Sequence, residues 1–108
     1  MKVRFWTSKT GRSSVEEWLR ALSLADRAKV SAVLAAIEES GFQAVGCDFR
    51  QVQGRLWEIK IRTPSGGFRI FYVIVTGPEM ILLHALRKGT QKTPKKDVEL
   101  ALKRMEDI

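Results

Sequence analysis

The segment Phe68–Val75 restricts the possible folds of this sequence more than any other feature. Side chains alternate between the two faces of a strand, and here both faces are apolar except at Arg69. A strand of this composition is covered by protein on both sides. We therefore predict that Phe68–Val75 forms a central strand.

Two further strand-like segments flank this one, Leu56–Arg62 before it and Met80–Arg87 after it. The breaks between the segments, residues 63–67 and 76–79, are short and contain the glycine and proline residues that favour turns. Breaks of this length and composition predict hairpins. The three segments together predict a three-stranded antiparallel meander.

The chain before the meander predicts one strand and two helices. Lys2–Trp6 alternates polar and apolar residues, as a short strand does. Ser13 and Glu16 have the spacing of a capping box at a helix start. A second helix is expected to begin after Ser23 and to end at Gly41, which suits a left-handed helix cap. The short break between them predicts an antiparallel helical hairpin.

The remaining segments complete the predicted fold. Phe42–Gln53 has no clear pattern, and we interpret it as a connecting loop. Thr93 and Pro94 predict a C-terminal helix, with Thr93 as its N-cap and Pro94 at its first position. The order of elements predicts a small α+β protein, and 108 residues suffice for one domain, so we expect a single domain over residues 1–108.

The charge balance favours an anionic partner. The chain has 19 Lys and Arg residues against 12 Asp and Glu residues, a net charge of +7. Such an excess favours nucleic acid over a membrane surface. Met1–Trp6 alternates instead of forming an apolar run, so we expect no secretory signal. Ile70–Val75, the longest apolar stretch, is too short to cross a bilayer, and we expect no contact with a membrane.

Cys47 is the only cysteine and His84 the only histidine. A lone cysteine forms no internal disulfide, which favours a cytoplasmic protein. One Cys and one His do not make a zinc site, and the carboxylates lack the clustering that metal-dependent nucleases need. The sequence therefore predicts no metal and no other cofactor.

Charged residues on the predicted strands indicate a functional surface. Glu58, Lys60 and Arg62 share one face of their strand, and for this strand alone a solvated outer face explains them. Arg69 is different, because an unpaired guanidinium in an apolar strand is costly to bury. It either pairs with a carboxylate such as Glu58 or binds an anion, and its forked geometry matches a phosphate.

The end of the third strand segment supplies more candidates, and His84 is the natural proton carrier among them at neutral pH. A lone histidine in an apolar run is nevertheless more often a packed structural residue. We expect the meander to bring the following residues together in one cleft: Glu58, Lys60, Arg62, Arg69, and His84 or Lys88. Arg87 and Lys92 extend the basic surface.

Such a cleft suits the cleavage of RNA at its 2′-hydroxyl group without a metal. This reaction needs a base for the hydroxyl, cations for the charged phosphorane and a proton donor for the leaving 5′-oxygen. The general base remains open between Glu58, His84 and a lysine. A non-catalytic RNA-binding regulatory protein would use the same basic face.

Three segments in order, Leu56–Arg62, Phe68–Tyr72 and Leu82–Pro94, resemble the phage-derived HigB-like branch of the RelE toxin superfamily. The final helix, with Glu99–Ala101 and Lys103-Arg104, is also similar. The resemblance implies the toxin of a type II toxin–antitoxin pair, an endoribonuclease (mRNA interferase) that cleaves messenger RNA on the ribosome. It also implies a HigA-like antitoxin partner with a helix-turn-helix. The related ParE branch, which targets DNA gyrase, is the alternative within the superfamily.

The resemblance also assigns roles to individual residues. Arg69 falls on the arginine that many members use to hold the scissile phosphate. Lys60 and Arg62 fall on basic positions that help to neutralise it, and Arg87 and Lys88 lie near the residue that assists the leaving group. Several members have a catalytic Tyr or His near the C-terminus, and the final helix here has neither.

Overall fold

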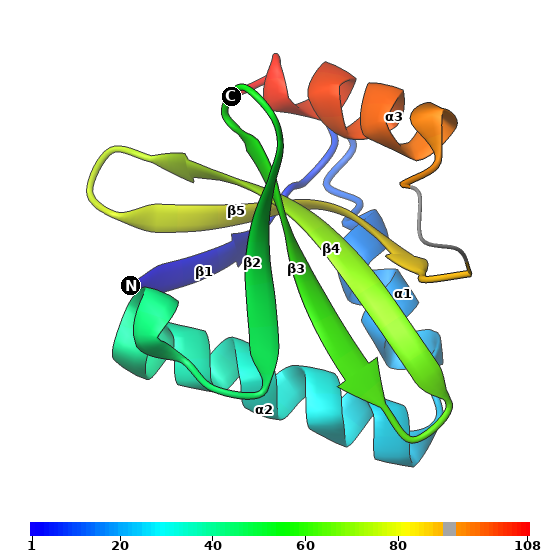
Figure 1. The fold of residues 1–108 in the computed structure, drawn as a ribbon. Helices are drawn as coiled ribbons and strands as arrows, with labels where there is room; N and C mark the ends of the chain where they lie inside the picture. Colours follow the sequence, from blue (N-terminus) through cyan, green and yellow to red (C-terminus); the bar gives the residue numbers. More distant parts are fainter. Residues whose placement is uncertain (90–92) are drawn as a thin grey trace.

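The structure is a computed structural model that describes residues 1–89 and 93–108. In chain order its elements are as follows: β1 (Lys2–Phe5), α1 (Ser14–Ala21), α2 (Leu24–Ser40), a 3₁₀ turn η1 (Gly41–Gln43), β2 (Cys47–Gln53), β3 (Leu56–Thr63), β4 (Gly66–Val75), β5 (Glu79–Arg87) and α3 (Lys95–Met105) (Figure 1). This order confirms the predicted α+β class, and the three predicted meander strands agree with β3, β4 and β5 to within two residues.

In the described parts of the chain the strands form one five-stranded sheet in the order β1-β5-β4-β3-β2. Neighbouring strands from β2 to β5 are antiparallel, whereas β1 is parallel to β5. The strand predicted to be central, β4, is the middle strand of the five.

The prediction that Phe42–Gln53 is a connecting loop is wrong, because its second half forms β2 and pairs with β3 along Cys47–Gln51. The pairing register shifts between Gln51 and Gln53, which interrupts the alternation that identifies a strand in a sequence. Gly54 lies in the two-residue turn to β3 with a φ of 55°, a conformation that glycine adopts without strain. The meander therefore has four antiparallel strands instead of three.

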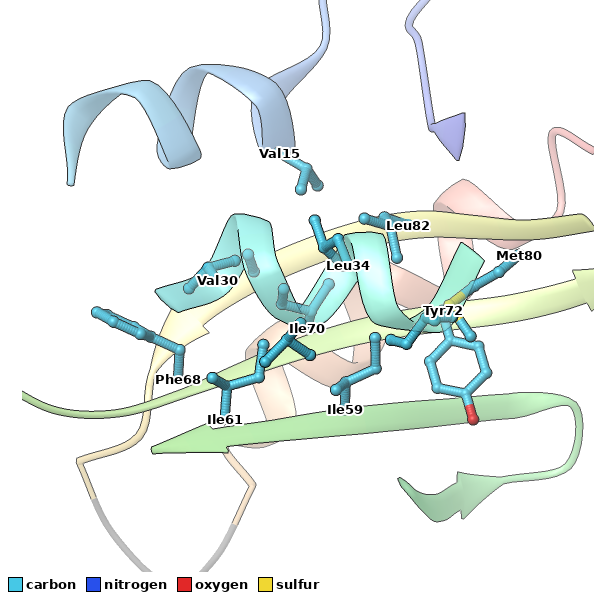
Figure 2. Close-up of a cluster of buried hydrophobic side chains, with 13 residues drawn as sticks. Val15, Val30, Leu34, Ile59, Ile61, Phe68, Ile70, Tyr72, Met80 and Leu82 are labelled. Atoms are coloured by element: carbon cyan, nitrogen blue, oxygen red, sulfur yellow. The ribbon is translucent and has the colours of Figure 1, made fainter. Parts of the chain in front are cut away.

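One face of the sheet packs against α1 and α2 and forms the larger apolar core. Figure 2 shows Ile59, Ile61 and Ile70 from the sheet meeting Val30 and Leu34 of α2. Tyr72, on the same face of β4, is also buried there. Burial of these side chains removes apolar surface from water, which is the main stabilising contribution to the fold.

Trp57 departs from the expected core position. Alternation places it on the same face as Ile59 and Ile61, yet 37% of it is exposed. It lines a surface hollow with Phe42, Phe49, Tyr72 and Ile74 at the β2 side of the sheet. The helices cover this end of the face only in part.

The other face of the sheet packs against α3, which lies across it in Figure 1. Ala101 of α3 is fully buried against a smaller apolar cluster that includes Phe71 and Leu83. The central strand β4 is thus covered on both faces, as its composition predicted.

The predicted N-cap of α1 at Ser13 is confirmed, and α2 begins after Ser23 and ends at Gly41 as predicted. The Ser13 hydroxyl accepts a hydrogen bond from the Glu16 N–H, and the Ser23 hydroxyl accepts one from the Asp26 N–H. Gly41 ends α2 with a φ of 59°. These bonds satisfy backbone N–H groups that a helix start leaves without a partner.

The prediction that Thr93 caps α3 is wrong. The N-cap is Pro94, without a side-chain capping bond, and the helix begins at Lys95. The hydroxyl of Thr93 instead accepts hydrogen bonds from Arg69 and Arg50. A charged donor makes a stronger hydrogen bond than a backbone amide does, which accounts for this choice of partner.

A β-bulge in β5 changes which side chains face α3. Phe71 pairs with His84 and Tyr72 pairs with Leu82, so Leu83 is an extra residue on β5. Beyond this point the alternation of β5 is shifted, and His84 lies on the α3 face, where its ring stacks on Phe71. The carbonyl of Leu83 accepts a hydrogen bond of 2.8 Å from the Arg104 guanidinium of α3.

Within the described parts of the chain, every helix is too short or too polar to span a lipid bilayer.

Candidate nucleic-acid interface

A cationic hollow of about 170 Å³ opens where β3 ends and β4 begins. Three basic side chains line it: Lys60, Arg62 and Lys88. Asp48 and Gly67 complete much of its wall. Arg62 and Lys88 are exposed and Lys60 is half-buried, so the hollow is open to a ligand. We call it the basic hollow.

The strand register explains why these side chains meet. On β3, Lys60 pairs with Asp48 of β2 on one side and with Arg69 of β4 on the other. Arg62 pairs with Gly67, which has no side chain to fill the space. The backbone N–H of Lys88 donates a 2.8 Å hydrogen bond to the Gly67 carbonyl, which fixes Lys88 at the same end of the sheet.

The surroundings of Lys60 make its ammonium group easier to deprotonate. Burial lowers the pKa of Lys60, and the positive charges of Arg50 and Lys88 lower it further. Glu58 acts in the opposite direction, and Arg69 again lowers the pKa. A lysine with a lowered pKa has a larger neutral fraction near pH 7, and only the neutral amine can act as a general base.

Glu58 and Arg69, two of the predicted catalytic residues, are buried beside this hollow. Glu58 is 0% exposed and Arg69 is 1% exposed. The expected solvated face at Glu58 is therefore wrong. Of the two alternatives for Arg69, the structure shows the ion pair, with Arg69 Nη1 at 3.7 Å from Glu58 Oε2.

This buried pair extends to two further residues. Arg50 Nε lies 3.1 Å from the other carboxylate oxygen of Glu58. The Thr93 hydroxyl accepts hydrogen bonds from the guanidinium groups of Arg69 and Arg50. We call Arg50, Glu58, Arg69 and Thr93 the buried charge network. Because Arg69 is buried, direct contact with a phosphate would require the groups that cover it to move.

His84 has a structural partner on α3. Its Nε2 lies 2.7 Å from Asp97 Oδ1, in the first turn of that helix. Only 17% of the His84 side chain is exposed. The predicted cleft thus divides, since Lys60, Arg62 and Lys88 share the basic hollow while His84 holds α3 on the sheet.

Arg87 lies on the opposite face of the sheet. Its guanidinium stacks over the Phe68 ring and donates hydrogen bonds to the carbonyl and hydroxyl oxygens of Ser65. Lys92, the last of the predicted basic residues, lies outside the described part of the chain. Among the described residues, no three His, Cys, Asp or Glu side chains gather where they could hold a metal ion.

Two charged residues near the hollow, Arg50 and Asp48, were missed because their segment was interpreted as a loop. The alternation of Cys47 and Phe49 with charged residues was the available signal. The bulge after Gln51 made the alternating stretch too short to be distinctive.

The fold and the basic hollow define a small α+β protein with a cationic surface at one end of its sheet. The model of the phage-derived Gp49-like protein family (DUF891) matches residues 17–106, and the chain belongs to this family. It is a toxin-like family of the RelE/HigB type. No similarity to a curated protein was found. The predicted relationship is confirmed at this level, and the HigB-like branch stays a prediction.

Proposed function

We propose that this protein is the toxin of a type II toxin–antitoxin pair and cleaves messenger RNA on the ribosome without a metal. The basic hollow carries the proposal, because it joins a half-buried lysine of lowered pKa to two exposed cations. Membership of a toxin-like family supports it.

In the proposed reaction the neutral amine of Lys60 takes the proton of the 2′-hydroxyl group. The 2′-oxygen then forms a bond to phosphorus, and the bond from phosphorus to the 5′-oxygen breaks. The products are a 2′,3′-cyclic phosphate and a 5′-hydroxyl end. This assignment selects a lysine from the three candidate bases, because Glu58 is buried in ion pairs and His84 is held by Asp97.

Arg62 and Lys88 stabilise the negative charge that develops on the phosphorane oxygens. Both are exposed at the hollow and are free to approach a phosphate from solvent. The Lys88 ammonium donates its proton to the leaving 5′-oxygen, which balances the proton that Lys60 accepts. Arg87, on the other face, takes no part.

Arg69 has an indirect role in this proposal. Its guanidinium keeps Glu58 paired and adds positive charge beside Lys60, its cross-strand neighbour. Replacing it with Ala would leave the Glu58 carboxylate buried with one cationic partner fewer. Loss of activity in that variant would therefore combine a folding defect with a catalytic one.

The toxin proposal also implies a protein partner. We propose a HigA-like antitoxin with a helix-turn-helix, which binds the folded toxin and prevents it from reaching the ribosome. Because ribosomes and messenger RNA are its targets, the proposed site of action is the cytoplasm.

The test adds the purified protein to translating ribosomes with a defined messenger RNA and maps cleavage by primer extension. We expect cleavage by the wild type, and a loss of about 10²- to 10⁴-fold in rate for Lys60→Gln, the range for removing a general base. Lys103→Gln, which removes an exposed charge on α3, is the matched control and should cleave normally. Transcripts left intact by folded wild-type protein would refute the proposal, and RNA binding without cleavage would favour a regulatory role.

A further inference from the structure

Arg50 lies next to Lys60 on the sheet, although the sequence pattern gave it no role. Arg50 pairs with Glu58 and Asp48 pairs with Lys60 across β2 and β3. Arg50 and Lys60 are therefore diagonal neighbours on one face of the sheet, within reach of each other for long side chains.

The contacts of Arg50 hold its guanidinium in place. Its Nε lies 3.1 Å from Glu58 Oε1, and its Nη2 donates a hydrogen bond of 3.4 Å to the Thr93 hydroxyl. Glu58 is fully buried, whereas 49% of the Arg50 side chain is exposed. Arg50 thus connects the buried charge network to the surface at the edge of the basic hollow.

We propose that Arg50 is a positioning residue of the RNA-cleaving site, held by Glu58 beside Lys60 so that its fixed positive charge favours the neutral, proton-accepting form of that lysine. The inference rests on the proposed function, in which Lys60 is the general base. Arg50 itself does not need to touch the RNA.

The charged groups around Lys60 agree with this role. They come from four parts of the chain: Arg50 and Asp48 on β2, Glu58 and Arg62 on β3, Arg69 on β4, and Lys88 after β5. Among the charges that change the pKa of Lys60, Arg50 has the largest effect, ahead of Lys88. Arg50 also pairs with Glu58, the carboxylate that favours the protonated lysine.

The first experiment follows the Lys60 side chain by NMR during a pH titration of the wild type and of Arg50→Gln. We expect the pKa of Lys60 to rise toward the usual 10.5 when the positive charge is removed. Arg50→Lys keeps a positive charge and should keep the pKa close to the wild-type value. The control is Arg55→Gln, whose guanidinium binds the Ile74 carbonyl at 3.3 Å instead of the network. An unchanged Lys60 titration in Arg50→Gln would overturn the inference.

If Arg50→Gln does not fold, the wild type still provides a test. Raising the salt concentration screens the surrounding cations, so the pKa of Lys60 should rise between about 0.02 M and about 0.5 M salt. A pKa that stays constant over this range would show that neighbouring charges, Arg50 among them, do not control the lysine.

The second experiment measures RNA cleavage against pH. The rate should rise with pH as Lys60 loses its proton, so a raised pKa in Arg50→Gln moves this rise to higher pH. For each unit of increase in the pKa, the neutral fraction at neutral pH falls about tenfold. If Arg50→Gln cleaves RNA with the pH profile of the wild type, the role of Arg50 alone is refuted. If the Lys60 titration shifts in Arg50→Gln but the protein does not cleave RNA, the proposed function alone is refuted.

Discussion

The two faces of β3 and β4 belong to the same strands and differ in charge, and we call them the apolar face and the charged face. Toward α1 and α2 the strands present Ile59, Ile61, Phe68 and Ile70, all buried in one apolar cluster. Toward α3 and the basic hollow they present a smaller apolar cluster that includes Phe71, together with charged side chains. Two of these charged side chains are buried as well: Glu58 and Arg69. The first face stabilises the fold by the burial of apolar surface.

The second face has a different energetic character. Removing two charges from water is costly, and their attraction rarely does more than offset that cost. A buried ion pair is therefore weak evidence of stabilisation. Apolar clusters on both faces stabilise the fold, whereas in the proposed function the charged residues of the second face set the electrostatics of the site.

The largest expected effect comes from breaking the buried pair on the charged face. Glu58→Gln leaves Arg69 buried without its carboxylate partner, and we expect a loss of roughly 3–5 kcal/mol in the free energy of unfolding. Urea denaturation measures this free energy of unfolding. Glu99→Gln, which changes an exposed i,i+4 pair on α3, should cost less than about 1 kcal/mol. Equal free energies of unfolding for the two variants would show that the buried pair affects stability no more than the exposed pair does.

A cavity on the apolar face should have a comparable or slightly smaller effect. Ile70→Ala removes fully buried methyl and methylene groups, and we expect a loss of about 2–5 kcal/mol. Val45→Ala, at an exposed position, should change stability by less than about 0.5 kcal/mol. The Lys60 titration should stay unchanged in Ile70→Ala, and a change there would mean that the two faces are not independent.

Replacing both members of the pair distinguishes stability from function. The double variant Glu58→Leu with Arg69→Met substitutes apolar side chains of similar size. We expect the free energy of unfolding to stay constant or to rise by roughly 1–4 kcal/mol. RNA cleavage should fall in the same variant, because Arg50 loses the Glu58 carboxylate that holds it beside Lys60. A large decrease in the free energy of unfolding would instead show that the Glu58–Arg69 pair stabilises the fold.

The smallest effect concerns Asp26, a buried carboxylate in the first turn of α2. Hydrogen bonding by Ser65 is the main cause that lowers the pKa of Asp26. A carboxyl with a lowered folded-state pKa stabilises the protein above its unfolded-state pKa, and this contribution is lost as the pH falls. Ser65→Ala should therefore lower the melting temperature at pH 7 and make less difference at pH 3. The same decrease at both pH values would contradict this linkage.

The sequence predicted most of the fold because the relevant signals are local. Serine caps, the glycine that ends α2 and the alternation in β3 and β4 depend on neighbours a few residues away. The strand β2 was missed because its bulge leaves only Cys47 and Phe49 in clear alternation. A pattern of this length does not distinguish a strand from a loop.

The candidate site was predicted less completely because it depends on tertiary contacts. The sequence identified the charged faces, and the basic residues Lys60, Arg62 and Lys88 do line one hollow. The buried Arg69 donates a hydrogen bond to Thr93, which comes from a segment 24 residues later in the chain. Whether a charged side chain is covered is decided by such distant segments, and neither composition nor periodicity records it.

The extra residue in β5 changes the alternation of its side chains between the two faces of the sheet. Before Leu83 its side chains follow one alternation, and after it they follow the other, with the Arg104 guanidinium binding the carbonyl at the change. If β5 kept a regular alternation through Leu83, the two sides would be exchanged for every residue downstream as far as Lys88. The bulge therefore keeps Lys88 on the same side of the sheet as Lys60.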